Sequence, residues 1–245
     1  MKARAAAAAL LIAATYGPSA YADPDDYVAL PGVEYGEREL ELRFGTATKS
    51  GEDRASAASL AFGYGLTPWW ATEVYAKYNR SGSEATRFDA IEWENKFEIG
   101  EPGQYFVDMG FLVELEWAND RAEGYELRIG PLFQKDFGLV QTNFNFLLER
   151  HFRSDEHEVT ELGYQWQVKY RWRPEFEFGL QGFGDVGKWN DWDPHDVQTH
   201  TVGPAIFGKF PLGGQQVFKY NAAVLFKASS AAADRTLRAQ LEYEF

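Results

Sequence analysis

Apolar and polar residues alternate along most of this chain with a period of two. The alternation is clearest at the C-terminal end, where the apolar set is Leu237, Ala239, Leu241, Tyr243 and Phe245 and the polar set is Arg238, Gln240, Glu242 and Glu244. A period of two is that of a β-strand with one apolar and one polar face. Because chain ends fray unless something holds them, we expect this strand to pair with the first strand of a closed sheet.

The same alternation recurs in twelve segments, and helix signals are scarce. The predicted strands cover about residues 36–47, 55–66, 69–80, 87–99, 105–117, 124–133, 139–152, 159–172, 175–186, 198–210, 216–228 and 236–245. Links after odd-numbered strands are longer and polar, whereas links after even-numbered strands are tight and contain Pro or Gly. Outer-membrane barrels have this asymmetry, and Greek-key sandwiches have no reason for it. Residues 36–245 are therefore predicted to form one all-β domain, a transmembrane up-and-down antiparallel β-barrel of 12 strands closed by its first and last strands.

Aromatic residues gather near the predicted strand ends, where amphipathic rings favour the headgroup level of a bilayer. The expected periplasmic girdle is Trp69, Trp70, Tyr105, Phe133, Phe137, Trp172, Phe176, Phe210, Tyr243 and Phe245; the outer one is Phe44, Tyr78, Phe88, Trp117, Tyr125, Phe152 and Phe226. Three residues fit the scheme poorly. Pro131 and Pro204 fall inside strands, where each removes a ladder hydrogen bond, so we expect a bulge or a shortened strand there. Asn95 falls on the outward face without an explanation.

The first 22 residues have the pattern of a secretory signal peptide. Lys2 and Arg4 precede an apolar run over 5–14, and Ala20-Tyr21-Ala22 is an A-x-A cleavage pattern. The apolar run is too short to span a bilayer. We expect the mature chain to begin at Asp23 and residues 23–35 to be a lead-in, either periplasmic or entering the lumen. A lead-in folded into the lumen would favour a closed barrel.

Charge and composition narrow the function classes. Removing residues 1–22 leaves 24 − 2 = 22 Lys and Arg against 37 Asp and Glu, a formal charge of −15. This excess argues against nucleic acid as a partner. The chain has no cysteine, so disulfide and thiol chemistry are excluded.

The signal peptide, the evenly spaced strands and the ending Leu241-Glu-Tyr-Glu-Phe245 together resemble bacterial outer-membrane β-barrel proteins. The resemblance implies export to the outer membrane of a Gram-negative cell and recognition of Phe245 by the barrel-insertion machinery. The stretches Phe62-Gly-Tyr-Gly-Leu-Thr67 and Gly179-Leu-Gln-Gly-Phe183 are similar to porin-like, transporter-type barrels grouped with the MetA-pathway phenol-degradation family. That likeness implies uptake of small, hydrophobic or aromatic molecules. It carries over no site residue.

Charged residues on the inward face predict two walls in the lumen. The acidic wall is Glu92, Glu94, Glu98, Asp108, Glu114 and Glu116; the basic wall is Lys169, Arg171, Lys209, Lys219, Lys227 and Arg238. Facing walls would set up a transverse field that selects polar solutes. Long side chains could instead pair across the barrel and fill it.

Three functions follow as hypotheses. The first is a porin-like channel for passive passage of small solutes, and the second is a closed structural or adhesive barrel with a charge-filled lumen. The third is a lipid-modifying hydrolase at the outer rim, which would use His151, His157, His195 or His200, although no spacing of a nucleophile and an acid supports it. The acidic loop 190–196 lacks the calcium-loop pattern. We therefore predict no enzyme activity, no cofactor and no metal, with outer-membrane lipid, lipopolysaccharide and small solutes as partners.

Overall fold

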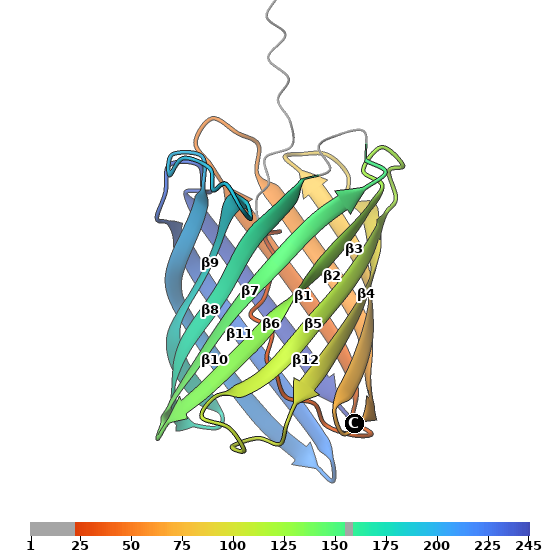
Figure 1. Ribbon diagram of the computed structural model, residues 1–245, viewed down its shortest axis with the longest axis vertical. Coiled ribbons are helices and arrows are strands. Elements are labelled where there is room, and N and C mark those ends of the chain that lie inside the picture. The colour runs from red at the N-terminus through yellow and green to blue at the C-terminus, as the bar shows by residue number, and fades with distance from the viewer. Residues whose placement is uncertain (1–22, 155–158) are drawn as a thin grey trace, which may run out of the picture.

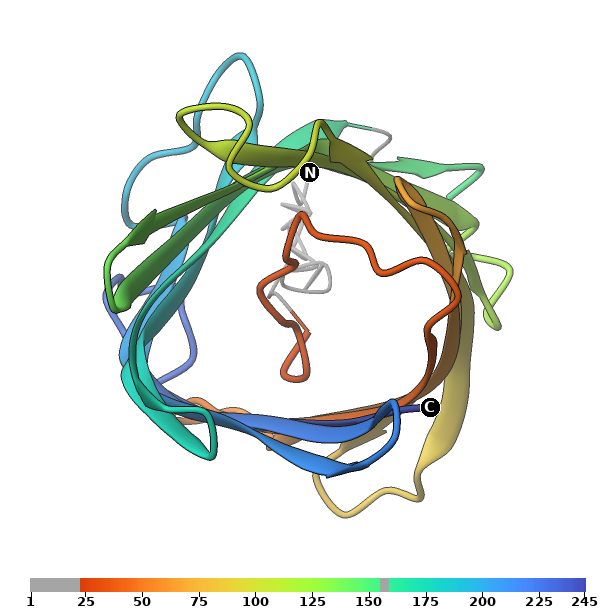
Figure 2. The same ribbon diagram turned by 90° about the horizontal axis from the view of Figure 1, so that it is seen from below.

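The computed structural model describes residues 23–154 and 159–245, and the predicted signal peptide lies outside them. The described residues form a closed antiparallel barrel in which each strand pairs with its neighbours in sequence (Figures 1 and 2). The strands are β1 (Arg38–Thr48), β2 (Ala55–Thr67), β3 (Trp70–Ser81), β4 (Arg87–Ile99), β5 (Asp108–Ala118), β6 (Tyr125–Phe137), β7 (Val140–Phe152), β8 (Thr160–Arg173), β9 (Phe176–Lys188), β10 (Thr199–Gly213), β11 (Gln216–Lys227) and β12 (Arg235–Glu244). The predicted all-β barrel of 12 strands is confirmed.

The C-terminal strand closes the barrel against β1. Across this seam Glu39 lies opposite Glu244, and Leu42 lies opposite Leu241. The backbone N–H of Phe245 donates a 2.8 Å hydrogen bond to the carbonyl of Arg38. Every backbone group of a strand that crosses a bilayer needs a partner, and closure supplies one to both end strands.

The two faces of the wall have the predicted chemistry. On β1, Leu40, Leu42 and Phe44 are exposed on the outside, whereas Glu41 and Arg43 are buried in the lumen. Aromatic rings contact one another at both ends of the barrel. Trp69, Trp70 and Phe97 stack, as do Tyr243 with Phe245 and Tyr125 with Phe152, whereas Tyr78 and Phe88 meet edge-on. No helix among the described residues is long and apolar enough to cross a bilayer.

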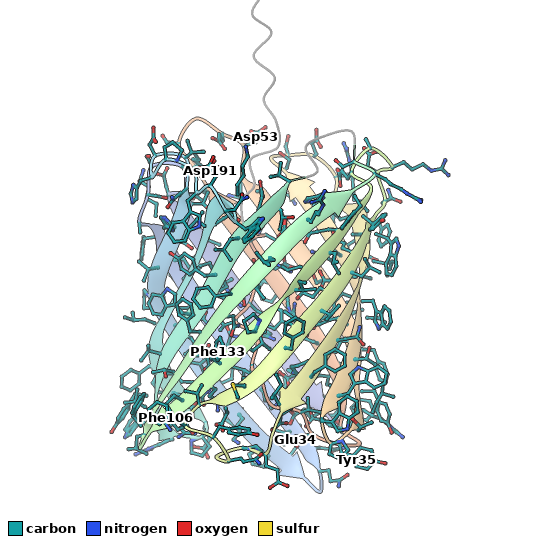
Figure 3. All side chains as sticks on the ribbon, viewed as in Figure 1. Glu34, Tyr35, Asp53, Phe106, Phe133 and Asp191 are labelled. Atoms are coloured by element: carbon teal, nitrogen blue, oxygen red, sulfur yellow. The ribbon has the colours of Figure 1, made fainter. Side chains whose placement is uncertain are left out.

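Short links and the C-terminus share one end of the barrel, which we call the periplasmic end. Figure 3 shows Glu34 and Tyr35 at this end, with Asp53 and Asp191 at the opposite, outer end. The link between β4 and β5 is longer than predicted, because β5 begins at Asp108 rather than near residue 105.

The expectation of a bulge or a shortened strand at Pro131 and Pro204 was wrong, because β6 and β10 both continue through their proline. The register of β6 with β7 is unchanged from the Ile129–Leu148 pair to the Leu132–Asn145 pair, and only the residues between them are unpaired. The register of β10 with β11 likewise continues across Pro204. Each proline therefore removes its hydrogen bond without adding a residue to the strand.

Each of the two prolines follows a glycine, and this glycine keeps the strands in register although one ladder hydrogen bond is missing. A Cβ atom on Gly130 would lie 1.8 Å from the carbonyl oxygen of Phe146, and one on Gly203 would lie 1.9 Å from that of Val224. In both places the carbonyl of the neighbouring strand occupies the space that a side chain would need. The dipeptide Gly-Pro thus keeps the register while one ladder bond is missing.

Asn95 lies on the outward face as predicted, but it is buried beneath an indole ring. Its Oδ1 accepts a 3.0 Å hydrogen bond from Nε1 of Trp70, and Nε1 of Trp93 donates to Oγ1 of Thr72 at 2.8 Å. Tryptophan N–H groups therefore satisfy outward polar atoms that would otherwise lack a partner in lipid.

We expect the substitutions G130A and G203A to destabilise the barrel by about 1–3 kcal/mol each, since the added methyl group overlaps a backbone carbonyl. The measurement is the temperature at which the folded band in a detergent gel converts to the unfolded band. G163A is the matched control, because a Cβ at Gly163 meets nothing closer than 3.6 Å. Equal midpoints for G130A, G203A and G163A would contradict this account of the Gly-Pro sites.

Candidate functional site in the barrel lumen

Residues 23–35, here called the N-terminal segment, run through the lumen from the outer end to the periplasmic end (Figures 1 and 2). Pro24 lies against Gly45 in the outer half of β1, where a Cβ would come within 1.9 Å of the Pro24 carbonyl oxygen. At the other end the N–H of Gly36 donates to the carbonyl of Gly65 at 2.8 Å. Of the two placements that the sequence left open for these residues, the structure shows the lumen.

Lys77 on β3 joins the outer part of the segment to the wall. Its Nζ lies 3.0 Å from a carboxylate oxygen of Asp23, 2.6 Å from Glu116 and 3.3 Å from Glu92. The cation therefore has two partners in the wall and a third in the segment. Because the group is largely buried, these contacts are weakly screened by solvent.

Arg128 on β6 repeats this arrangement. Its guanidinium pairs with Glu114 of the wall and lies 3.4 Å from Oδ1 of Asp26. Between these two anchors, the Ser59 hydroxyl donates a 2.6 Å hydrogen bond to Asp25. All three aspartates of the segment thus have a donor on the wall.

Arg43 on β1 is the centre of a buried aromatic cluster. Its guanidinium carbon lies 3.4 Å from the ring centroid of Tyr27 in the segment and 4.2 Å from that of Tyr75 in β3. The same guanidinium pairs with Glu41, and the Tyr27 hydroxyl donates to Glu94 at 2.5 Å. A cation between two ring faces is a favourable and directional contact. The contact between Arg43 and Tyr27 therefore holds the segment in place at the middle of the barrel.

The backbone of the segment is also bound by the wall. Asn145 donates a 2.9 Å hydrogen bond to the carbonyl of Ala29, and the Ala29 N–H donates to Gln165 at 3.4 Å. Nearer the periplasm the Val33 N–H donates to Glu98 at 2.8 Å. These bonds satisfy main-chain groups that no neighbouring strand reaches.

Two apolar patches on the inner wall receive the middle of the segment. Val28 packs with Phe183, Ala205, Phe207, Ala223 and Leu225, whereas Tyr27 and Ala29 pack with Leu112, Leu132 and Leu147. These patches were not predicted from the sequence. In the sequence, each patch residue is an apolar residue in the middle of a strand, at an inward-facing position where the alternation calls for a polar one.

The residues of the predicted acidic wall contact nearby strands, the N-terminal segment or a loop, and none of them contacts the predicted basic wall in the described residues. Glu92 and Glu116 bind Lys77, Glu114 binds Arg128, Glu94 binds Tyr27, Glu98 binds Val33, and Asp108 accepts from the N–H of Gly103 at 2.6 Å. Their cations, Lys77 and Arg128, were not among the predicted site residues. Both could have been recognised in the sequence, because each is a basic residue at an inward-facing position of a strand whose neighbouring strand carries inward glutamates.

The predicted basic wall is distributed along the height of the barrel. Lys169 pairs with Glu177, Arg171 with Asp136, Lys219 with Glu242, and Lys227 with Asp234 at the outer end. Lys209 lines the lumen cavity. Arg238 is buried and lies 4.9 Å from the ring centroid of Phe183, and its guanidinium has no hydrogen-bond partner among the described residues.

The free space in the lumen lies mainly on the periplasmic side of the Arg43 cluster. A cavity of about 500 Å³ extends from Tyr27 and Arg43 to Glu34 and Arg171 near the periplasmic end. Beside Pro24 and Arg238 in the outer half there is a pocket of only about 40 Å³. Residues 23–29 of the segment therefore contact the wall above the cavity of about 500 Å³, which we call the vestibule, and residues 30–34 line that vestibule.

The loop between β11 and β12 helps to cover the outer mouth. Ala232 and Ala233 are buried, and Asp234 accepts a 2.7 Å hydrogen bond from the N–H of Ser50. The Lys227 ammonium beside it, together with that N–H, holds the pKa of the Asp234 carboxyl below its usual range.

Three groups of ligand-type side chains have their ligand atoms within 4.8 Å of one another among the described residues: Glu92, Glu94 and Glu114; Glu37, Glu39, Glu242 and Glu244; and Glu126, Glu149 and His151. The first group is held by Lys77, Tyr27 and Arg128, and in the second Lys219 pairs with Glu242 and Glu244. In the third, Nε2 of His151 lies 3.5 Å from each glutamate. Except for Glu37 and Glu39, these carboxylates thus contact a donor of the protein.

The histidines give the hydrolase hypothesis no support. The ring of His200 contacts the Tyr164 hydroxyl and Gln198, each at 2.9 Å, and the ring of His151 contacts two glutamates. Neither ring is paired with a serine or threonine hydroxyl among the described residues. His157 lies outside them.

No model of a known protein family matches the chain, and no curated protein matches it. Solved structures do match its fold. An outer-membrane channel from Pseudomonas putida F1 aligns with a TM-score of 0.58 at 13% identity over 92% of this chain and 100% of that chain. The KdgM porin aligns at 0.55 with 7% identity over 84% and 98%.

The translocator domain of the autotransporter NalP from Neisseria meningitidis aligns equally well, at 0.55 with 9% identity over 86% and 88%. This protein thus shares its closed antiparallel barrel fold with outer-membrane porins and with this translocator domain. Identities this low show the fold alone, since one fold serves several functions. The likeness to the phenol-degradation family remains a prediction.

The absence of cysteine allows a direct accessibility test of the segment. We expect the V28C thiol to react slowly with a water-soluble maleimide, because Val28 is 5% exposed, and the L30C thiol to react fast, because Leu30 is 37% exposed. Adding D23N and D26N to V28C should speed its labelling about tenfold, since each change replaces a charge-assisted contact with a neutral one. A V28C thiol that reacts as fast as L30C in the unaltered background would show that the segment is not seated.

Proposed function

We propose that this protein is a porin-like outer-membrane channel for small solutes whose N-terminal segment closes the lumen in the conformation described here. The observation that carries the proposal is the placement of the segment in the outer half of the lumen, above a vestibule of about 500 Å³. Passage from one end to the other requires the segment to move. The apolar belt and the stacked aromatics at both ends support a location in a bilayer.

The contacts that hold the segment support a reversible closure. Lys77 keeps Glu92 and Glu116, and Arg128 keeps Glu114, when the aspartates of the segment leave. The wall therefore has no uncompensated cation at these sites after displacement, so the penalty for an unpaired buried charge is avoided. In the described residues the segment is joined covalently to the barrel only at its periplasmic end, next to β1.

The closed structural or adhesive barrel is the second candidate, and the filled outer half of the lumen favours it. The two candidates differ in what happens once the segment is removed. A channel then conducts, whereas a closed barrel stays closed because its wall side chains fill the lumen. The inward apolar patches would suit the small hydrophobic or aromatic solutes that the sequence likeness implies.

Deleting residues 23–31 should convert a barrel with little current into one with resolved single-channel steps in a planar bilayer, because the obstruction in the outer half is removed. L30A is the control and should leave the current low, since Leu30 is partly exposed and its side chain anchors nothing in the two apolar patches. A deleted barrel that folds and inserts but passes neither current nor solute would establish the closed alternative.

The open channel should prefer cations. The vestibule is lined by ten acidic residues (Glu34, Glu37, Glu39, Glu41, Glu73, Glu94, Glu98, Asp108, Glu177 and Glu242) and six basic ones (Arg43, Lys96, Lys169, Arg171, Lys209 and Lys219). An excess of one sign in a low-dielectric lumen concentrates counter-ions. The reversal potential of the deleted barrel in a potassium chloride gradient should have the sign of potassium permeation and should shrink as ionic strength rises. Anion preference would contradict this assignment.

A further inference from the structure

We infer that the inner wall is a binding groove for an extended acidic peptide, and that the N-terminal segment occupies it as a tethered copy of that ligand. This inference builds on the closure proposed above. It adds that the same groove recognises a separate peptide of the same chemistry, by contacts to its main chain, its carboxylates and its apolar side chains.

The first part of the recognition is independent of the ligand's sequence. Asn145 and Gln165 bind the carbonyl and the N–H of the same residue, Ala29, and Glu98 binds the N–H of Val33. Proteins that bind extended peptides use main-chain hydrogen bonds of this kind for affinity. Asn145 lies opposite Gln165 on the neighbouring strand and donates to its Oε1 at 3.2 Å, so the two amides position each other without the segment.

Glycines let the ligand backbone approach the wall. A Cβ on Gly45 would lie 1.9 Å from the carbonyl oxygen of Pro24, and one on Gly110 would lie 2.9 Å from the Cα of Pro31. Neither glycine has a positive φ, so backbone conformation does not demand glycine at these positions. The wall is therefore shaped to admit a peptide main chain at two heights.

The second part of the recognition is selective for acidic side chains. Lys77 and Arg128 bind the carboxylates of Asp23 and Asp26, and the Ser59 hydroxyl binds Asp25. Arg238 lines the pocket beside Asp26, and among the described residues it has no hydrogen-bond acceptor although it is 4% exposed. A third cation near two that already hold carboxylates favours an acidic ligand over a neutral one.

The third part consists of two sockets that suit consecutive residues of an extended chain. Side chains of such a chain point alternately to opposite sides. Tyr27 and Ala29 enter the patch of Leu112, Leu132 and Leu147, whereas Val28 enters the opposite patch with Phe183 and Phe207. The apolar wall residues are thus spaced to take alternate side chains of one extended peptide.

The test uses the barrel that lacks residues 23–31 and a free synthetic peptide of residues 23–31 carrying a fluorescent label at its C-terminus. Fluorescence anisotropy in detergent should show saturable binding to the deleted barrel and much weaker binding to the intact barrel, in which the tethered segment competes for the groove. The D23N and D26N form of the peptide should bind at least about tenfold more weakly, because two charge-assisted contacts are lost. Equal affinity for the two peptides, or equal binding to intact and deleted barrels, would overturn the groove.

The result separates this inference from the proposed channel. Saturable, charge-dependent binding to a deleted barrel that passes no current would support the groove and contradict the channel. A deleted barrel that conducts but neither binds the peptide nor is blocked by it would overturn the groove and leave the channel standing.

A second measurement covers a deleted barrel that fails to fold. In the full chain carrying V28C, excess free peptide should compete with the segment and speed maleimide labelling of the introduced thiol, whereas the D23N and D26N peptide should not. Labelling rates that are independent of both peptides would overturn the inference.

Discussion

The hydrogen bonds between β1 and β12 close the barrel, and the rest of the structure depends on that closure. In a bilayer no backbone N–H or carbonyl of an end strand can be left without a partner, so the sheet must meet itself. Once it does, each strand has one face toward lipid and one toward the lumen. The alternation of side chains then fixes which residues are inside, and a shift of one residue would turn every charge toward lipid.

Closure also brings like charges together in the lumen. Glutamates lie directly opposite one another in the pairs Glu39–Glu244, Glu41–Glu242, Glu73–Glu94, Glu92–Glu116 and Glu94–Glu114. Like charges in such positions are destabilising. Lys77, Arg43 and Arg128 offset this by each pairing with wall carboxylates, and the N-terminal segment takes further contacts on the same cations. The charge network that stabilises the wall is therefore the one that binds the segment.

The seam, the strand count and the lipid-facing row were predictable because each rests on local periodicity. Leu40, Leu42 and Phe44 on β1 show the pattern without reference to any other strand. The bulge or shortened strand expected at Pro131 was wrong, because that expectation considered the proline without its neighbours. Gly130 before it provides the space that keeps the register, and that effect depends on a carbonyl of the neighbouring strand.

By itself the sequence determined the fold, the inward and outward faces and the excess of acidic residues, since period, charge and turn residues are local properties. Only the tertiary structure decided where residues 23–35 lie and which lumen charges pair, because Asp23 and Lys77, or Ala29 and Asn145, meet only after the barrel has closed around them. The same reason applies to the inward leucines and Phe183. In the sequence they are apolar residues at positions where the alternation calls for polar ones, and in the barrel they form the sockets for Tyr27 and Val28.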